Sequence, residues 1–199
     1  MEIVKKRIGI VGGGQLGKMM ILEAKRLGLY VAVLDPAADC PSSSICDKLI
    51  VADLNDLSGY IELSKHTDVI TYEWENISVP ALEKLEKEGH KVYPSVASLR
   101  TIQNKYIQNS ALKKAGIPVP KFALAANTDE IRELGKPENF GYPLMLKTTS
   151  GGYDGKGVAP IKTEDDVEDA FHQLGSGVKE LMVEEFVDFQ KEISIIACR

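Results

Sequence analysis

The sequence predicts an α/β protein in which a Rossmann-like parallel sheet is followed by part of an α+β domain. Over residues 7–93, short apolar runs alternate with amphipathic stretches of helical periodicity. Beyond a proline-flanked strip at 116–120, the pattern changes to short strands separated by a glycine-rich loop. Strands that alternate with helices through short loops are typical of a parallel sheet covered on both faces. The second pattern favours a small antiparallel sheet with helices on one face.

The first region carries five apolar runs that we predict to be strands. Between them, apolar side chains such as Leu16 and Met20 recur at helical spacing, and Gly28 and Gly89 stand where helices should end. The predicted strands are 7–11, 30–34, 48–51, 69–72 and 91–93, and the predicted helices are 15–27, 57–66 and 79–88.

Two helical stretches, 96–100 and 102–115, lead from this region to the proline-flanked strip, which is a probable boundary. We therefore predict a first domain at 1–94, a helical connector at 95–120 and a second domain at 121–199. Thr163 to Asp166 has the spacing of a capping box and should begin a helix. The second domain should contain strands at 122–125, 144–148, 158–161, 181–184 and 193–197 and helices at 128–134 and 165–174.

The composition argues against several functional classes. The formal net charge of −5 disfavours nucleic acid as the main partner. No apolar run reaches the roughly 18 residues that a membrane-spanning helix needs, and the first residues lack the apolar core of a signal peptide. The three cysteines have neither CxxC spacing nor paired histidines, so they suit a reducing cytoplasm and give no metal site.

The most informative segment is the glycine-rich loop from Lys147 to Val158, which lies between two apolar runs. Its four glycines permit positive φ angles and close backbone approach to a polyanion, and Lys147 and Lys156 add positive charge. A P-loop does not fit, because Ser150 stands at its first glycine and Gly157 at its serine or threonine. A solvated hairpin turn would need fewer glycines. We predict a phosphate-binding flap between two strands.

A second glycine-rich segment, Gly12–Gly17, follows the first strand and opens the first helix with the pattern GxGxxG. Asp35 ends the next strand, about where a dinucleotide-binding domain carries its ribose-binding acid. The bare N–H groups of a helix N-terminus suit any phosphate, so a sugar phosphate fits as well as a dinucleotide. Close packing of the helix on the strand would also require glycine. The pattern alone leaves these possibilities open.

Acidic residues follow two further apolar runs. Glu73 and Glu75 flank Trp74 at the end of the fourth predicted strand, where open parallel sheets bind their ligands. A carboxylate there could bind amino or hydroxyl groups of a substrate, although a plain acidic loop is the alternative. In the segment 180–192, an exposed link between two strands could bind an adenine edge, with Glu192 in reach of a ribose.

The order of these motifs resembles the ATP-grasp superfamily and, within it, the N5-carboxyaminoimidazole ribonucleotide synthase family, also called the ATPase subunit of phosphoribosylaminoimidazole carboxylase. The resemblance runs from Ile8 to the end of the chain, and SGGYDGKG at 150–157 is close to diagnostic. It implies a preATP-grasp substrate-binding domain at 1–94 and an ATP-grasp nucleotide-binding lid at 121–199. The matching segments are GGGQLGKMM (12–20), TYEWENI (71–77), PSVASLRTIQNKYIQN (94–109), LKTTSGGYDGKGV (146–158) and VEEFVDFQKEISI (183–195).

The resemblance also implies roles for individual residues. Gln15, Leu16 and Glu73 would contact the ribonucleotide substrate, with the first glycine loop on its sugar phosphate. The family's usual Asp-Arg pair reads Asn104-Lys105 here, so Lys105 offers ATP a single point charge. Residues implied to bind ATP are Lys105, Lys147, Gly152, Tyr153, Asp154, Gly155, Lys156, Gly157, Val158, Glu184, Glu185, Phe186, Val187 and Glu192.

The implied reaction is the ATP-dependent carboxylation of 5-aminoimidazole ribonucleotide by bicarbonate in purine biosynthesis. ATP would convert bicarbonate to carboxyphosphate, whose carboxyl group the substrate amine captures, and Mg²⁺ would neutralise phosphate charge. Family members continue for a further half, where we expect the catalytic, magnesium and bicarbonate ligands. The resemblance thus implies an inactive fragment of a cytoplasmic enzyme that is a homodimer at full length.

Three alternatives stay open. Another ATP-grasp ligase acting on a nucleotide is the nearest, and Tyr153 and Asp154 in the flap favour the carboxylase over it. A nicotinamide-dependent oxidoreductase would explain Gly12–Gly17 and Asp35 but leaves the flap without a role. A non-catalytic nucleotide sensor would be favoured by a natural stop after Arg199.

Overall fold

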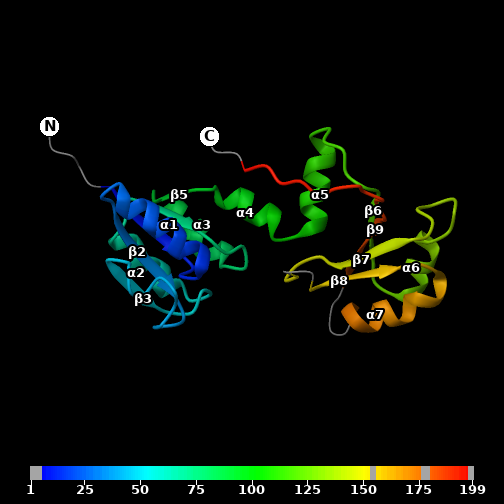
Figure 1. Ribbon diagram of the computed structural model, residues 1–199, viewed down its shortest axis with the longest axis horizontal. Coiled ribbons are helices and arrows are strands. Elements are labelled where there is room, and N and C mark those ends of the chain that lie inside the picture. Colours follow the sequence, from blue (N-terminus) through cyan, green and yellow to red (C-terminus); the bar gives the residue numbers. More distant parts are fainter. Residues whose placement is uncertain (1–5, 153–155, 176–179, 197–199) are drawn as a thin grey trace. The chain divides into compact units, whose positions relative to one another are not determined.

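A computed structural model describes residues 6–152, 156–175 and 180–196 (Figure 1). The chain divides between Gln103 and Asn104 into two compact units, here called unit 1 and unit 2. This division falls inside the segment 95–120, which the sequence predicts as a connector, so one of its helices belongs to each unit. No helix in the described ranges combines the length and the apolar character that crossing a membrane requires.

Unit 1 is built on a five-stranded sheet with the order β3-β2-β1-β4-β5, in which every neighbouring pair is parallel. This confirms the predicted parallel sheet, with strand limits close to the apolar runs. The strands are β1 (Arg7–Val11), β2 (Tyr30–Asp35), β3 (Lys48–Val51), β4 (Val69–Tyr72) and β5 (Lys91–Val92), and the helices are α1 (Gln15–Arg26), α2 (Leu57–Lys65), α3 (Val79–Lys87) and α4 (Val96–Ile102).

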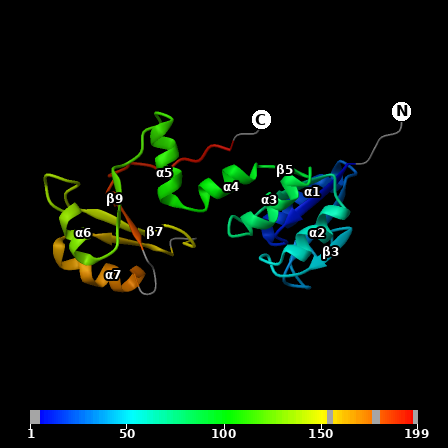
Figure 2. The same cartoon turned by 180° about the vertical axis from the view of Figure 1, so that it is seen from behind.

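Both faces of this sheet are buried, as predicted. Along β2, Val31 and Val33 point to a cluster with α1, whereas Ala32 and Leu34 point to a larger cluster with α2, α3 and α4. Successive side chains of a strand alternate between faces, so a strand covered on both sides reads as a continuous apolar run. Figure 2 shows these layers from behind. The burial fixes the carboxyl ends of β1 and β4 side by side, where the candidate site begins.

Unit 2 is built on a four-stranded antiparallel sheet with the order β6-β9-β7-β8. Leu144, Leu146 and Val183 point from one face into a core formed with α6 and α7, which confirms the predicted α+β architecture. The strands are β6 (Phe122–Ala125), β7 (Leu144–Thr148), β8 (Val158–Ile161) and β9 (Leu181–Glu185), and the helices are α5 (Lys105–Lys114), α6 (Thr128–Leu134), η1 (Glu164–Asp166) and α7 (Val167–Gly175).

Helix α5, which the sequence places in the connector, packs on the opposite face of this sheet. The ring of Tyr106 meets Phe122 edge to face, with 5.4 Å between the centroids. Phe122 lies across from Glu184 in the β6–β9 register, so both side chains share that face. The helix is therefore held against β6, next to β9, the strand that carries Glu184 and Glu185.

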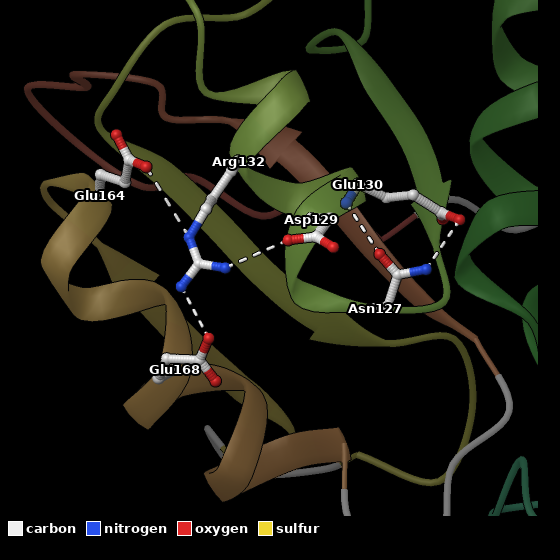
Figure 3. Close-up of polar contacts among 6 residues, drawn as sticks. All are labelled: Asn127, Asp129, Glu130, Arg132, Glu164 and Glu168. Atoms are coloured by element: carbon white, nitrogen blue, oxygen red, sulfur yellow. Dashed lines mark hydrogen bonds and ion pairs between the residues drawn. The ribbon is translucent and has the colours of Figure 1, made fainter.

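Charged contacts hold α6, η1 and α7 together on the core side of the unit 2 sheet. Arg132 donates hydrogen bonds to Glu168 at 2.6 Å and Asp129 at 3.4 Å, and its guanidinium lies 3.7 Å from Glu164 (Figure 3). The hydrogen bond to Glu168 raises the pKa of Arg132 and lowers that of the carboxyl group. The predicted capping box is present, with Asp166 accepting from Thr163.

The strand predicted at 193–197 is wrong for residues 193–196, which have no regular structure, and residue 197 lies outside the described ranges. Ile193, Ile195 and Ile196 are 79%, 86% and 98% exposed. A strand forms only where a neighbouring strand takes its backbone hydrogen bonds. Within the described residues no strand pairs with this segment, so its apolar alternation has nothing to pack on.

Candidate functional site

The N-terminus of α1 is filled by a carboxylate from the neighbouring strand. Within the described residues, the N-cap Gly14 offers α1 no side-chain hydrogen bond. Glu73 follows β4 directly, and its two carboxylate oxygens accept the N–H groups of Gly14 at 3.1 Å and Gly17 at 2.9 Å. The helix N-terminus attracts negative charge, and Glu73 supplies it from within the protein.

The glycines of this loop make room for the Glu73 side chain. A Cβ added to Gly12 would lie 2.6 Å from Cγ of Glu73, and one added to Gly14 would lie 2.6 Å from its Oε1. Gly12 also has a φ of +97°, which favours glycine. At Gly17, a Cβ would lie 2.6 Å from the carbonyl oxygen of Gly12. The glycine spacing therefore serves close approach of Glu73 and of α1 to the sheet.

Asp35, the acid expected in a dinucleotide-binding domain, is also engaged internally. Its Oδ2 accepts the N–H of Gly13 at 2.7 Å, and its Oδ1 accepts the N–H of Ala37 at 2.8 Å. A dinucleotide would need the N–H groups of the glycine loop for its pyrophosphate. Asp35 and Glu73 already accept the N–H groups of Gly13, Gly14 and Gly17, so the geometry disfavours the nicotinamide hypothesis. The sugar-phosphate hypothesis for this loop meets the same obstacle.

Beside the loop lies a cavity of about 410 Å³ at the carboxyl ends of the unit 1 strands. Three carboxylates line it, and among its described lining residues there is neither lysine nor arginine. Such a lining suits hydroxyl and amino groups better than phosphate. Gln15 and Leu16 are exposed on α1 outside the cavity lining, so only Glu73 of the three predicted residues borders it. The lining is Gly12, Gly14, Asp35, Pro36, Asp53, Leu54, Asn55, Glu73, Trp74 and Asn76.

Unit 2 brings two of the predicted ATP-binding residues into direct contact. In the β7–β9 register Lys147 lies across from Met182, and Met145 lies across from Glu184, so Lys147 and Glu184 are diagonal neighbours on one face. The ammonium group of Lys147 forms an ion pair with Oε2 of Glu184. Glu184 is only 7% exposed, and Asn109 of α5 donates a hydrogen bond to its Oε1 at 2.7 Å.

The base of the flap is closed by glycine. The N–H of Thr148 donates to the carbonyl of Gly157 at 2.9 Å, and Gly157 has a φ of +84°. A Cβ at Gly152 would lie 2.5 Å from the carbonyl oxygen of Lys156. Lys156 is exposed, whereas the predicted site residues at 153–155 lie outside the described ranges. The glycines at 152 and 157 thus allow the loop to narrow before its tip.

The other predicted ATP-binding residues differ in how they lie relative to this face. The N–H of Lys105 donates to the carbonyl of Thr149 at 2.8 Å, which places the start of α5 beside the end of β7. Glu185 instead accepts the N–H of Lys121 at 3.4 Å. Phe186 and Val187, with 41% and 48% exposure, and the exposed Glu192 follow in a segment without regular structure.

Sequence reasoning missed Asn109, Asp53 and Asn55. Asn109 stands one helical turn after Lys105, a spacing that puts both on one side of α5 and could have marked it. Asp53 and Asn55 follow β3, the position where parallel sheets present ligand-binding residues.

Both units match models of known protein families. Residues 5–103 match the family model of the ribonucleotide synthetase preATP-grasp domain, and residues 110–199 match that of the ATP-grasp domain. The chain belongs to the ATP-grasp superfamily. The predicted phosphate-binding flap, residues 147–158, lies within the matched ATP-grasp domain.

Three similar proteins illustrate the likeness, and each is named as a synthase or synthetase of N5-carboxyaminoimidazole compounds. N5-carboxyaminoimidazole ribonucleotide synthase of Bacillus subtilis is 39% identical over 193 residues, covering 96% of this chain and 49% of the relative. The Staphylococcus aureus N5-carboxyaminoimidazole synthetase structure with ADP has a TM-score of 0.86 and 35% identity, covering 96% of this chain and 50% of that one. The Aspergillus clavatus synthase structure with ADP and 5-aminoimidazole ribonucleotide has a TM-score of 0.84 and 33% identity, covering 94% and 48%. The chain spans about half the length of the curated relatives it matches.

Proposed function

We propose that this chain is the substrate- and nucleotide-binding half of an enzyme that carboxylates 5-aminoimidazole ribonucleotide with bicarbonate and ATP. The observation that carries the proposal is the Lys147–Glu184 pair, which lies beside a glycine-rich flap on the sheet face that α5 packs against, in a chain similar to N5-carboxyaminoimidazole ribonucleotide synthases. Bicarbonate as the carboxyl source and a homodimer at full length rest on the sequence resemblance alone.

The unit 2 residues suit the binding of ATP. Lys147, Lys105 and Lys156 provide positive charge at one end of the sheet face, where β7 and the flap meet. The flap glycines allow backbone N–H groups to approach phosphates, and the strip at 184–187 with Glu192 would hold adenine and ribose. Phosphoryl transfer depends mainly on positioning and charge stabilisation, which such groups supply. When bound, ATP supplies the activated phosphoryl group.

The unit 1 cavity suits the sugar and amine portion of the ribonucleotide. Glu73 is held by two backbone N–H groups, and the remaining lone pairs of its carboxylate can still accept a substrate hydroxyl or amine. Asp35 and Asp53 extend the acceptor surface along the cavity. Because the lining is acidic, the substrate phosphate would lie outside the cavity, whereas the family resemblance implies that the glycine loop receives it. Gln15 and Leu16 would meet the substrate only beyond the cavity rim.

A magnesium site does not fit the described residues, which include no cluster of three or more histidine, cysteine, aspartate or glutamate side chains. The proposed function therefore assigns these residues no contact with Mg²⁺. What this part of the chain does is bind, orient and exclude water from the reactants, as the flap would on closing.

Binding experiments on the 199-residue chain test the proposal. Titration of ¹⁵N-labelled protein with ADP should shift residues of β7, β9 and the flap, and titration with 5-aminoimidazole ribonucleotide should shift residues around Glu73. Lys147→Met should weaken ADP binding about tenfold, the scale of a charge-assisted contact. The matched control Lys162→Met removes an exposed lysine just after β8 and should leave ADP binding unchanged. Binding of reduced nicotinamide in place of ADP would support the oxidoreductase instead.

A further inference from the structure

Glu184 is the single acidic or basic residue among the described residues whose whole surface is nearly buried. A buried carboxylate is stable only when ionic partners and hydrogen-bond donors compensate it, and removing a partner costs much more than an exposed contact is worth. Glu184 has two such partners, the ammonium group of Lys147 on one oxygen and the amide of Asn109 on the other. The three side chains form a cluster on the sheet face opposite the α6–α7 core.

Two negatively charged groups compete for Lys147, namely Glu184 and the phosphates of the nucleotide. Its ammonium group is bound to Glu184, and it is also the residue that the proposed function assigns to ATP phosphates. Its side chain is 25% exposed, so it can reach a ligand, whereas the side chain of Glu184 is 9% exposed and cannot follow. Phosphate binding must therefore draw Lys147 partly away from Glu184. The free energy of that separation is subtracted from the affinity for the nucleotide.

Asn109 determines how large that free energy is. Its Nδ2 donates to Oε1 of Glu184 at 2.7 Å, on the oxygen that Lys147 does not use. It is held there because two contacts fix the start of α5. Asn104 caps the helix by accepting a hydrogen bond from the N–H of Ile107 at 3.0 Å, and the ring of Tyr106 packs on Phe122. Hydrogen bonds to a charged group are stronger than neutral ones, so Asn109 keeps Glu184 compensated as Lys147 moves.

We propose that Asn109 is a positioning residue for the nucleotide site: it holds the carboxylate of Glu184 so that Lys147 can transfer from Glu184 to the phosphates of the nucleotide. The inference rests on the proposed function, because it takes the phosphates to bind at Lys147. Glu184 acts as an internal substitute for the phosphate, because its carboxylate holds the ammonium group of Lys147. Without Asn109, Glu184 would depend on Lys147 alone and would retain it.

The test compares two ligands that differ only in phosphate. The variants are Asn109→Leu, which keeps the side-chain size and removes the donor, and Asn109→Asp, which adds a like charge beside Glu184. The matched control is Gln108→Leu, because Gln108 stands next to Asn109 on α5 and makes no side-chain hydrogen bond within the described residues. ADP and adenosine are titrated into each ¹⁵N-labelled 199-residue variant, and thermal melting confirms that it is folded.

We expect Asn109→Leu to weaken ADP binding about tenfold, the scale of a hydrogen bond to a charged group, and to leave adenosine binding within about twofold. Asn109→Asp should weaken ADP binding more, because the added carboxylate also attracts Lys147. Gln108→Leu should change neither ligand.

An equal loss for ADP and adenosine would mean that Asn109 only maintains the fold, and it would overturn the inference. Unchanged ADP binding in folded Asn109→Leu would overturn it as well. If Asn109→Leu does not fold, Asn109→Asp provides the test, because its loss of ADP affinity can be compared with its loss of adenosine affinity in the same way. A wild-type chain that binds neither ligand would remove the proposed function and this inference with it, whereas wild-type binding with no change in the ratio removes the inference alone.

Discussion

The two glycine-rich segments of this protein, residues 12–17 and 147–158, each contain four glycines and have different structural roles. In unit 1, Gly13, Gly14 and Gly17 donate their N–H groups to Asp35 and Glu73, so the loop binds carboxylates of its own chain. In unit 2, Gly152 and Gly157 let the flap close at its base, and the cations lie next to it. Glycine-rich spacing thus predicts where backbone donors are bare, but the neighbouring strands decide whether a ligand or an internal carboxylate receives them.

The largest effect should come from filling the space that unit 1 keeps for close backbone contact. Gly17→Ala places a Cβ 2.6 Å from the carbonyl oxygen of Gly12, a backbone atom that cannot turn aside. We expect the free energy of unfolding to fall by about 3 kcal/mol, the upper range for overpacking. Urea denaturation measures it, with Gly28→Ala as the control.

At Gly28 a Cβ would meet nothing within 4 Å, so only its positive φ of 72° opposes the substitution. We expect a loss of about 1 kcal/mol there. A loss at Gly17 no larger than that at Gly28 would contradict the view that the close approach of α1 to the glycine loop requires glycine at position 17.

A smaller effect should follow from removing the internal carboxylate. Glu73→Ala frees the N–H groups of Gly14 and Gly17 and should lower the free energy of unfolding by about 2 kcal/mol, since hydrogen bonds to charged groups are lost. The exposed loop should then bind inorganic phosphate, which would raise the melting temperature of the variant but not of the wild type.

The matched control for that experiment is Glu75→Ala, which removes a half-buried carboxylate two residues away, whose Oε1 accepts a hydrogen bond from Asn76 at 3.4 Å. It should neither destabilise the protein comparably nor create phosphate binding. Stabilisation of the wild type by phosphate to the same degree as Glu73→Ala would contradict the view that Glu73 already occupies this loop.

The smallest expected effect on stability concerns one tyrosine in each unit whose hydroxyl group is buried. The hydroxyl of Tyr60 donates to the carbonyl of Leu54 at 2.6 Å, whereas the buried hydroxyl of Tyr142 has no hydrogen-bond partner within the described residues. We expect Tyr60→Phe to cost about 1 kcal/mol at neutral pH and Tyr142→Phe to cost almost nothing, as measured by urea denaturation. Equal costs would show that the hydrogen bond of Tyr60 contributes no stability.

The pH dependence of stability sharpens this comparison. Burial raises the pKa of Tyr60 to about 12, so its charged form is disfavoured in the folded protein. Between pH ~10 and 12 the unfolded chain releases the Tyr60 proton while the folded protein keeps it. The contribution of Tyr60 to the free energy of unfolding is therefore full below pH ~10 and is lost as the pH rises towards 12. The stability gap between the wild type and Tyr60→Phe should therefore shrink over that range.

Much of the fold follows from local sequence. The apolar runs and helical spacings predict the strands of both sheets, because burial on one or two faces leaves a period in the chain that needs no distant partner. The resemblance of the flap and of the segment 183–195 to the ATP-grasp superfamily also required only the sequence. The apolar segment 193–196 marks the limit of this reasoning, since alternation makes a strand only where a neighbouring strand is available.

What the sequence by itself determined is therefore the order of the elements, the two glycine segments and the family. Only the tertiary structure decided which donors meet which acceptors. Glu73 reaches Gly14 across 59 residues, and Asn109 reaches Glu184 across 75. Such contacts leave no periodic signal in the chain, because strand order and the packing of α5, rather than local spacing, bring their side chains together. For that reason the family resemblance implies a sugar phosphate at the first loop, whereas the fold brings the carboxylate of Glu73 to its N–H groups.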